Sequence, residues 1–141
     1  MIRRRLRFEL RELLLVAAGA VPGALLRWQI AVQIGPWIGG HAGANLLVNV
    51  VGSFVLGVLA GPIPRRTTLL LWLGIGFCGC FTTFSSWMLD VVRLLQAGKP
   101  ALALAVMAAT LIGGLACAAL GLACSRRLFR LRRPGLPRSR P

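Results

Sequence analysis

The stretch GFCGCFTTFSSW, residues 76–87, lies near the centre of an apolar run that is long enough to cross a bilayer. Its glycines lower helix propensity, and its threonines and serines can bond backbone groups that a broken helix leaves free. Broken membrane helices occur only where they are buried in protein or line a cavity, and their free carbonyls and helix ends form ion sites. The stretch therefore predicts a membrane helix that is broken at its centre.

The chain contains four long apolar runs, at residues 13–34, 41–61, 68–95 and 101–124. Each is near or above the roughly 20 residues that a helix needs to span hydrocarbon. Because 57% of all residues are hydrophobic and only 14% are charged, an ordinary water-soluble surface is excluded. Short connectors rich in Gly and Pro make neighbouring helices antiparallel. The sequence predicts an all-α integral membrane protein with four transmembrane helices.

The charge is strongly basic, with a net value of +14. In a soluble protein this would indicate nucleic-acid binding, but here the arginines cluster at the two chain ends, beside apolar helices. We interpret residues 1–12 as a basic cytoplasmic N-terminus, 13–124 as the transmembrane unit and 125–141 as a basic, disordered tail. The expected location is the cell inner (plasma) membrane, with lipid as a partner, no nucleic acid, and both termini cytoplasmic.

Several polar side chains fall inside the predicted spans. Asn45, Asn49 and Ser53 are four residues apart and share one face of the second helix. Both interhelical hydrogen bonding and donation of an amide N–H to a permeating anion are open for this face. Arg27 lies in the last third of the first run, where its guanidinium either snorkels to the interface beside Trp28 or faces an aqueous vestibule that collects anions.

The third run also carries an acid and a set of aromatic rings. Asp90 is the only acid after residue 12, and we expect it to pair with Arg93 near the end of the helix. Phe81, Phe84 and Trp87 recur at spacing three, which places their rings on one side of the second half-helix. Ring edges there can attract an anion, or the rings can simply pack in the core. No combination of nucleophile, base and acid indicates an enzyme.

Three motifs occur in order across the spans: PGALLRW, then NLLVNVVGSFVLG, then GFCGCFTTFSSW. Together they resemble the CrcB/Fluc family of fluoride ion channels, over about residues 19–121. The resemblance implies small subunits that pair in antiparallel orientation to form a double-barrelled channel. Such a channel exports fluoride passively, so that the anion does not accumulate in the cytoplasm. The implied partners are fluoride and a homologous antiparallel subunit.

The resemblance also assigns site residues. Asn49 resembles the pore asparagine of the second helix, and Arg27 resembles the vestibule arginine. Gly79 and Thr82 resemble the residues at the third-helix break whose backbone carbonyls hold a structural sodium ion between subunits. The remaining implied pore positions are Thr83, Phe84, Ser85, Trp87 and Thr110.

This chain departs from the family pattern at several of these positions. Trp87 stands where the second pore phenylalanine is usual, and the polar track of the fourth helix is reduced to Thr110. Ala44 and Asn45 replace the Gly-Thr that usually opens the second-helix motif. One of the two pores is therefore expected to be altered or inactive, which leaves open a non-conducting partner subunit in a heterodimeric channel.

Two other functional classes are open on general grounds. A small multidrug transporter also has four short helices that can pair in antiparallel fashion, but it would demand a glutamate embedded in the first helix. Here Glu9 and Glu12 precede that span. A non-transporting membrane scaffold would explain the small residues of the fourth helix, but not the broken third helix.

The distribution of arginines bears on the dimer. With four spans, both termini and the loop at residues 61–66 lie on one side, which then carries fourteen arginines, whereas the other side has only Arg93 and Lys99. An antiparallel homodimer needs a chain that inserts both ways, and hence a nearly balanced charge. The bias predicts an antiparallel heterodimer with an oppositely biased homologue.

Overall fold

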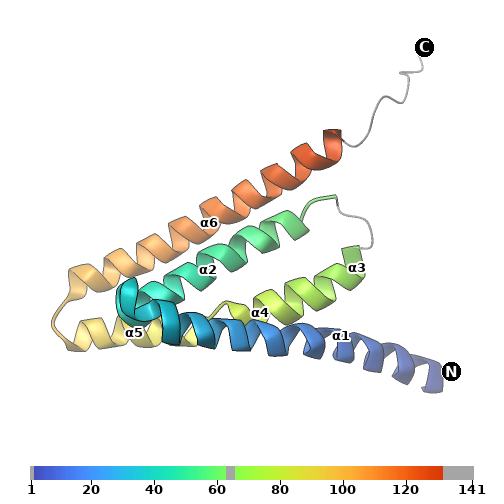
Figure 1. Cartoon of the computed structure of the whole chain (residues 1–141), viewed down its shortest axis with the longest axis horizontal. Coiled ribbons are helices and arrows are strands. Elements are labelled where there is room, and N and C mark those ends of the chain that lie inside the picture. The colour runs from blue at the N-terminus through green and yellow to red at the C-terminus, as the bar shows by residue number, and fades with distance from the viewer. Residues whose placement is uncertain (1, 63–65, 132–141) are drawn as a thin grey trace, which may run out of the picture.

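A computed structural model describes residues 2–62 and 66–131, and these residues are helical apart from short turns (Figure 1). The first helix, α1, covers Ile2–Gln29 and continues through a π-helical turn, Ile30–Ile34, and a 3-10 turn, Gly35–Trp37. Helix α2 covers Gly40–Leu59. The turn before it uses Gly39 and Gly40, whose φ angles of 94° and 74° only glycine adopts readily.

The third run contains several helical segments in sequence. They are α3 at Arg66–Leu69, the π-helical segment η3 at Leu70–Cys78, α4 at Gly79–Phe81 and α5 at Ser85–Gln96. Residues 82–84, between α4 and α5, are not helical. After a turn at residues 97–99, α6 covers Pro100–Leu131.

Four segments of the described chain are long and apolar enough to cross a membrane. They are Leu6–Trp37, Gly40–Leu59, Thr67–Gln96 and Pro100–Phe129. The prediction of an all-helical chain with four membrane-spanning segments is thus confirmed. The start of α1, the end of α2, the start of α3 and the end of α6 lie at one end of the bundle, and the turns that follow α1 and α5 lie at the opposite end (Figure 1).

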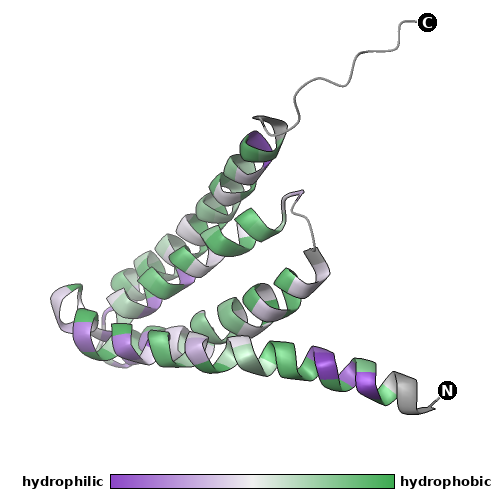
Figure 2. Cartoon of the chain, turned by 45° about the vertical axis from the view of Figure 1, so that its right-hand side comes forward, coloured by the Kyte–Doolittle hydropathy of each residue, from purple (hydrophilic) through white to green (hydrophobic). Residues whose placement is uncertain are grey.

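The helices pack mainly as two pairs, α1 with η3 and α2 with α6. Both pairs approach through glycines. A Cβ atom at Gly19 would collide with the Trp72 carbonyl oxygen, and one at Gly121 would collide with that of Phe54. Figure 2 shows that α1 and α6 diverge towards the termini. Small residues therefore let the backbones pack closely, as in membrane bundles generally.

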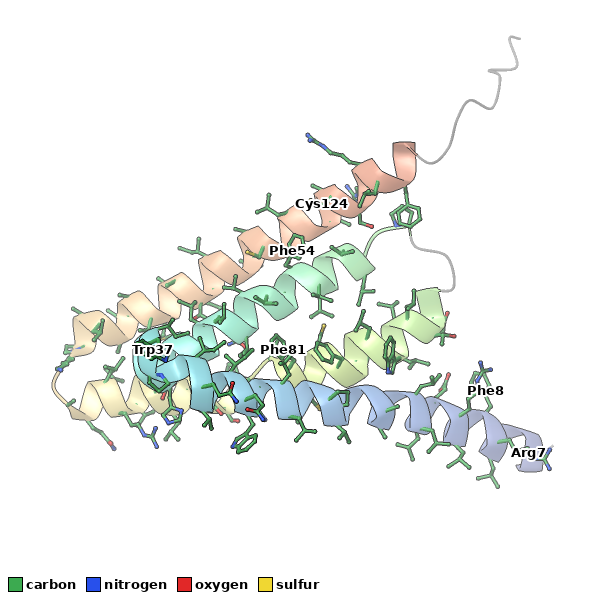
Figure 3. The ribbon with its side chains drawn as sticks, viewed as in Figure 1. Arg7, Phe8, Trp37, Phe54, Phe81 and Cys124 are labelled. Carbon is green, nitrogen blue, oxygen red and sulfur yellow. The ribbon has the colours of Figure 1, made fainter. Side chains whose placement is uncertain are left out.

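Most large apolar side chains project outward from the bundle, as Figure 3 shows for the side chains of α1 and α6. Trp37 is 87% exposed, and Leu115 on α6 is 73% exposed. Many buried positions are instead small or medium-sized, including Ala44, Val48 and Cys78, and only a few large side chains, such as Phe81 and Trp87, are buried. In water this arrangement would be costly, but it suits a chain surrounded by lipid.

The basic C-terminal end differs in part from the expected disordered tail at residues 125–141. Helix α1 begins at Ile2, and α6 continues past residue 124 to Leu131, so residues 125–131 are helix rather than disordered tail. The physical reason is that Arg, Leu and Phe continue a helix readily, and no Gly or Pro intervenes before Pro134. The rest of the predicted disordered tail, residues 132–141, lies outside the described residues.

Candidate functional site

The site is built around the non-helical residues 82–84. Helix α4 ends at Phe81, and the backbone of the next residue, Thr82, is extended at φ −75° and ψ 159°. Both the N–H and the hydroxyl of Thr82 donate to the Cys78 carbonyl oxygen, each at 2.9 Å. The threonine therefore satisfies the preceding turn while its own backbone leaves the helix.

Asn49, on α2, makes two hydrogen bonds to the backbone of this segment. Its Nδ2 donates to the Thr83 carbonyl oxygen at 2.9 Å, and its Oδ1 accepts the Thr83 N–H at 2.8 Å. Because one bond needs a donor and the other an acceptor, the amide can face Thr83 in only one orientation. These two bonds replace helical hydrogen bonds of Thr83, so an amide on α2 stabilises the interruption.

The bond from the Thr83 N–H to Asn49 also leaves the Gly79 carbonyl of α4 without its usual helical partner. In a continued helix the Gly79 carbonyl would accept the N–H of Thr83, but that N–H is bonded to Asn49. A Cβ atom at Gly79 would meet little, since only the Gly74 carbonyl oxygen lies within 4.0 Å. Helix ends leave such carbonyl groups available to other partners. The Gly79 carbonyl thus lacks its helical partner at Thr83, and Gly79 and Thr82 both line the cavity described next.

An open cavity of about 430 Å³ adjoins the interruption. Phe84 is 72% exposed there, and Ser85 is exposed beside it. The cavity is lined by Ala24, Arg27, Gly79, Cys80, Thr82, Thr83, Phe84 and Ser85. The structure therefore brings together most of the residues that the sequence singled out.

Two sequence-assigned pore residues lie elsewhere. Trp87 is only 5% exposed and packs with Val91 and Ala103, between α5 and α6. The hydroxyl of Thr110, on α6, donates to the Val106 carbonyl oxygen at 2.9 Å, and Thr110 is 7% exposed. Neither residue lines the cavity at the interruption. Their position in this chain is that of core residues.

The expectation that three aromatic rings share one side of a half-helix is wrong. Phe81 belongs to α4 and stacks on Phe77, with ring centroids 5.4 Å apart. Phe84 instead meets Trp87 edge to face, with centroids 5.6 Å apart and an interplanar angle of 63°. The cause is the extended backbone at Thr82, which ends the helical spacing between Phe81 and Phe84.

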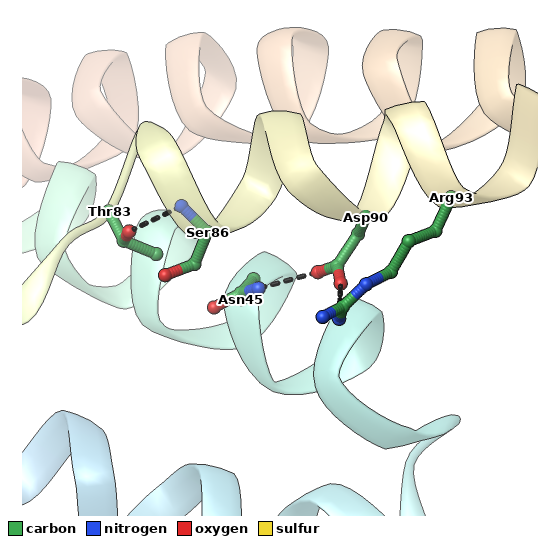
Figure 4. Close-up of polar contacts among 5 residues, drawn as sticks. All are labelled: Asn45, Thr83, Ser86, Asp90 and Arg93. Atoms are coloured by element: carbon green, nitrogen blue, oxygen red, sulfur yellow. Dashed lines mark hydrogen bonds and ion pairs between the residues drawn. The ribbon is translucent and has the colours of Figure 1, made fainter.

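A buried polar cluster follows on α5 (Figure 4). Asn45 Nδ2 donates to Asp90 Oδ2 at 2.6 Å, and both residues are less than a tenth exposed. Asp90 Oδ1 lies 3.7 Å from Arg93 Nη1, which confirms the expected pair. The Asn45 contact was not predicted, because nothing in the local pattern links residues 45 positions apart. It illustrates the rule that a buried carboxylate must be paired or hydrogen-bonded.

A second cavity, of about 320 Å³, opens beside this cluster. It is lined by Arg27, Trp28, Ala31, His41, Asn45, Ser86, Leu89, Asp90 and Arg93. Arg27 lines both cavities, and its Nε is buried without a hydrogen-bond partner. The positive charge of a guanidinium that lines two cavities suits an anion.

Side-chain metal ligands are sparse in the part of the chain that the structure describes. Within it, no three His, Cys, Asp or Glu side chains are grouped so that they could hold a metal ion. A cation at the interruption would therefore depend on carbonyl and hydroxyl oxygens, which are ligands that hard cations accept.

Comparisons with known proteins agree on one family. A family model described as CrcB-like protein, Camphor Resistance (CrcB), matches residues 14–122. The fluoride-specific ion channel FluC 2 of Parasynechococcus marenigrum (strain WH8102) is 54% identical over 137 residues, covering 96% of this chain and 95% of that relative. The fluoride-specific ion channel FluC 1 of Halobacterium salinarum is 48% identical over 105 residues, covering 74% and 86%. FluC of Haemophilus ducreyi is 42% identical over 111 residues, covering 79% and 89%.

Proposed function

Because the chain belongs to the family of CrcB-like proteins, we propose that it is one subunit of a fluoride-selective ion channel. The channel would export fluoride passively and so lower its concentration in the cytoplasm. The observation that carries the proposal is the polar interruption inside an apolar span, with Phe84 and Ser85 exposed at a cavity that Arg27 also lines. The chain is a channel subunit and not an enzyme.

Fluoride holds its hydration shell tightly, so a narrow pore must replace that shell with other donors. The available donors are the second Nδ2 hydrogen of Asn49 and the hydroxyls of Thr83 and Ser85. The exposed ring of Phe84 offers edge hydrogens with partial positive charge. Arg27 would hold anions at the cavity before they enter. Trp87 and Thr110 belong to the proposed pore only if the partner subunit reaches them, because in this chain both are buried.

In the membrane, the third span would be a discontinuous helix with a structural sodium ion at its break. The chain's own residues fit such a site, because the Gly79 carbonyl does not receive the Thr83 N–H and Thr82 is extended. Bound there, sodium would offset the partial negative charge of carbonyl oxygens from two facing subunits. The ion is hard, and backbone oxygens of interrupted helices are suitable ligands for it.

The proposed assembly is an antiparallel dimer in lipid. Its partner is a homologue whose positive charges favour the opposite orientation in the membrane. Phe84 and Ser85 are exposed in the single chain, as residues of a pore completed by a second subunit would be. Burial of Trp87 supports the alternative that this subunit contributes fewer pore groups than its partner. A multidrug-type transporter is disfavoured, because Asp90, the buried acid, is on α5 and is already bonded to Asn45.

Fluoride efflux from liposomes tests the proposed function. We expect liposomes that contain the chain and its homologous partner to release fluoride passively. Chloride release should be slower by at least about 100-fold, because a narrow pore selects between anions by how well it replaces their hydration shells. Liposomes without protein give the background. Equal release of fluoride and chloride, or no release of fluoride above background by the assembled dimer, would contradict the proposal.

The sodium site makes a separate prediction at Thr82. The change Thr82→Ile removes the hydroxyl bond to Cys78 and adds bulk where Gly52 already leaves no room for a Cβ beside Thr82. We expect the cross-linked dimer fraction to fall by at least about fivefold, as for overpacking of a close contact. Thr82→Ser is the matched control, because it keeps the hydroxyl and is smaller. If dimer fraction and flux both survive Thr82→Ile, the cation site is elsewhere.

A further inference from the structure

The cavity beside Asp90 is lined by more positive charge than Arg27 alone provides. Arg93 lines it together with Arg27, and Asp90 is the one acid among its lining residues. Two guanidinium groups against one carboxylate leave the cavity with a formal charge of +1, even with His41 neutral. A concave surface of one sign focuses the field and raises the local concentration of oppositely charged ions.

The partners of Asp90 differ in how they hold it. Asn45 donates a short hydrogen bond of 2.6 Å, within the buried region. Arg93 approaches only to 3.7 Å, outside hydrogen-bond distance, and its side chain is 59% exposed. Asp90 is therefore already satisfied by a hydrogen bond from Asn45, and most of the guanidinium donors of Arg93 remain open to solvent. Figure 4 shows Arg93 extending from α5 alongside Asp90.

Arg27 is the second arginine that lines this cavity. Its Nε is buried and has no hydrogen-bond partner, although the side chain lines the same cavity as Arg93. Two guanidinium groups line one cavity, and Arg93 is only weakly paired with Asp90, so the positive charge there suits a small anion. Arg27 also lines the cavity at the interruption, so an anion held here lies next to the proposed pore.

We propose that Arg93 is an anion-capture residue that works with Arg27 at this cavity. The inference rests on the proposed function for its physiological ligand, fluoride. Capture itself is a property of the cavity and extends to other small monovalent anions. The cavity lies at the end of the bundle opposite the termini, where α5 ends (Figure 1).

Fluorescence quenching by iodide tests capture without requiring conduction. Trp28 lines the cavity and is 58% exposed, so its emission reports anions there. The measurement uses a Trp37→Phe background in neutral detergent, because Trp37 is the most exposed tryptophan. We expect Arg93→Gln to reduce iodide quenching by at least about twofold at low ionic strength, and less at high salt. Quenching by neutral acrylamide should not change.

Lys99→Gln is the matched control. It removes the same charge from the same end of the bundle, six residues further on, but Lys99 does not line the cavity. Arg93→Lys should keep more quenching than Arg93→Gln. Equal effects of Arg93→Gln and Lys99→Gln would overturn the proposal. So would recovery of full quenching in the double variant Asp90→Asn/Arg93→Gln, because Arg93 would then act only by balancing Asp90.

Flux then separates this inference from the proposed function. In conducting dimers, Arg93→Gln should lower fluoride efflux about tenfold at low fluoride and low salt, and less at high fluoride, because capture raises the local anion concentration. Absence of efflux from the unaltered dimer contradicts the channel function and leaves the quenching result standing. Normal efflux and quenching in Arg93→Gln contradict the capture role and leave the channel function standing.

Discussion

Fluoride flux should fall by at least about 100-fold in an Asn49→Asp variant, because a carboxylate replaces the Nδ2 donor 2.9 Å from the Thr83 carbonyl oxygen. Two acceptors would then face each other, and one bond that stabilises the interruption would be lost. The new negative charge would also stand on an anion path and repel fluoride. Both effects act in the same direction. Liposome efflux of the assembled channel measures the loss.

Gln33→Glu is the matched control for this change. It also converts an amide to an acid, but Gln33 is exposed near the end of the first span, where its Nε2 donates to Gln29 Oε1 at 2.6 Å. We expect near-normal flux from it, since Gln33 lines neither of the two cavities. Undiminished flux from an assembled Asn49→Asp channel would show that Asn49 is neither an anchor of the interruption nor a pore residue.

The second large effect concerns orientation. We expect the chain to insert with both termini in the cytoplasm and, when purified alone, to give no fluoride flux above background, whereas flux appears with an oppositely biased homologue. The ends of α1 and α6 lie at the same end of the bundle (Figure 1), and they carry Arg7, Arg11, Arg126 and Arg127. Lys99 lies at the other end. Positive charge beside short loops sets orientation, and this chain has a strong bias.

A reporter fused to the C-terminus measures that orientation. The control is a chain in which the arginines flanking α1 and α6 are changed to glutamine. Its reporter signal should be divided between the two sides of the membrane, because the bias is then nearly balanced. Appreciable populations of the unaltered chain in both orientations, or robust flux from the purified chain alone, would count against an obligate partner.

The sequence by itself determined the features that depend on local composition. Long apolar runs and glycine-rich connectors specify four membrane-spanning helices, because hydrocarbon requires each backbone group to be satisfied within its own segment. The Asp90 to Arg93 pair was also predictable, since residues three apart on a helix are neighbours. Charge at the termini likewise needs no tertiary structure to be recognised.

Only the tertiary structure decided which polar groups meet. The bonds of Asn49 to Thr83 and of Asn45 to Asp90 join α2 to residues of the third span, and their formation depends on how far one helix is shifted and rotated against the other. The same holds for Trp87, which packs into a core with α6 while Phe84 stays exposed. A spacing of three in the sequence could not predict this, because the extended backbone at Thr82 ends the helical period between the rings. Local composition specifies where a helix ends, but contacts between helices determine which side chains gather there.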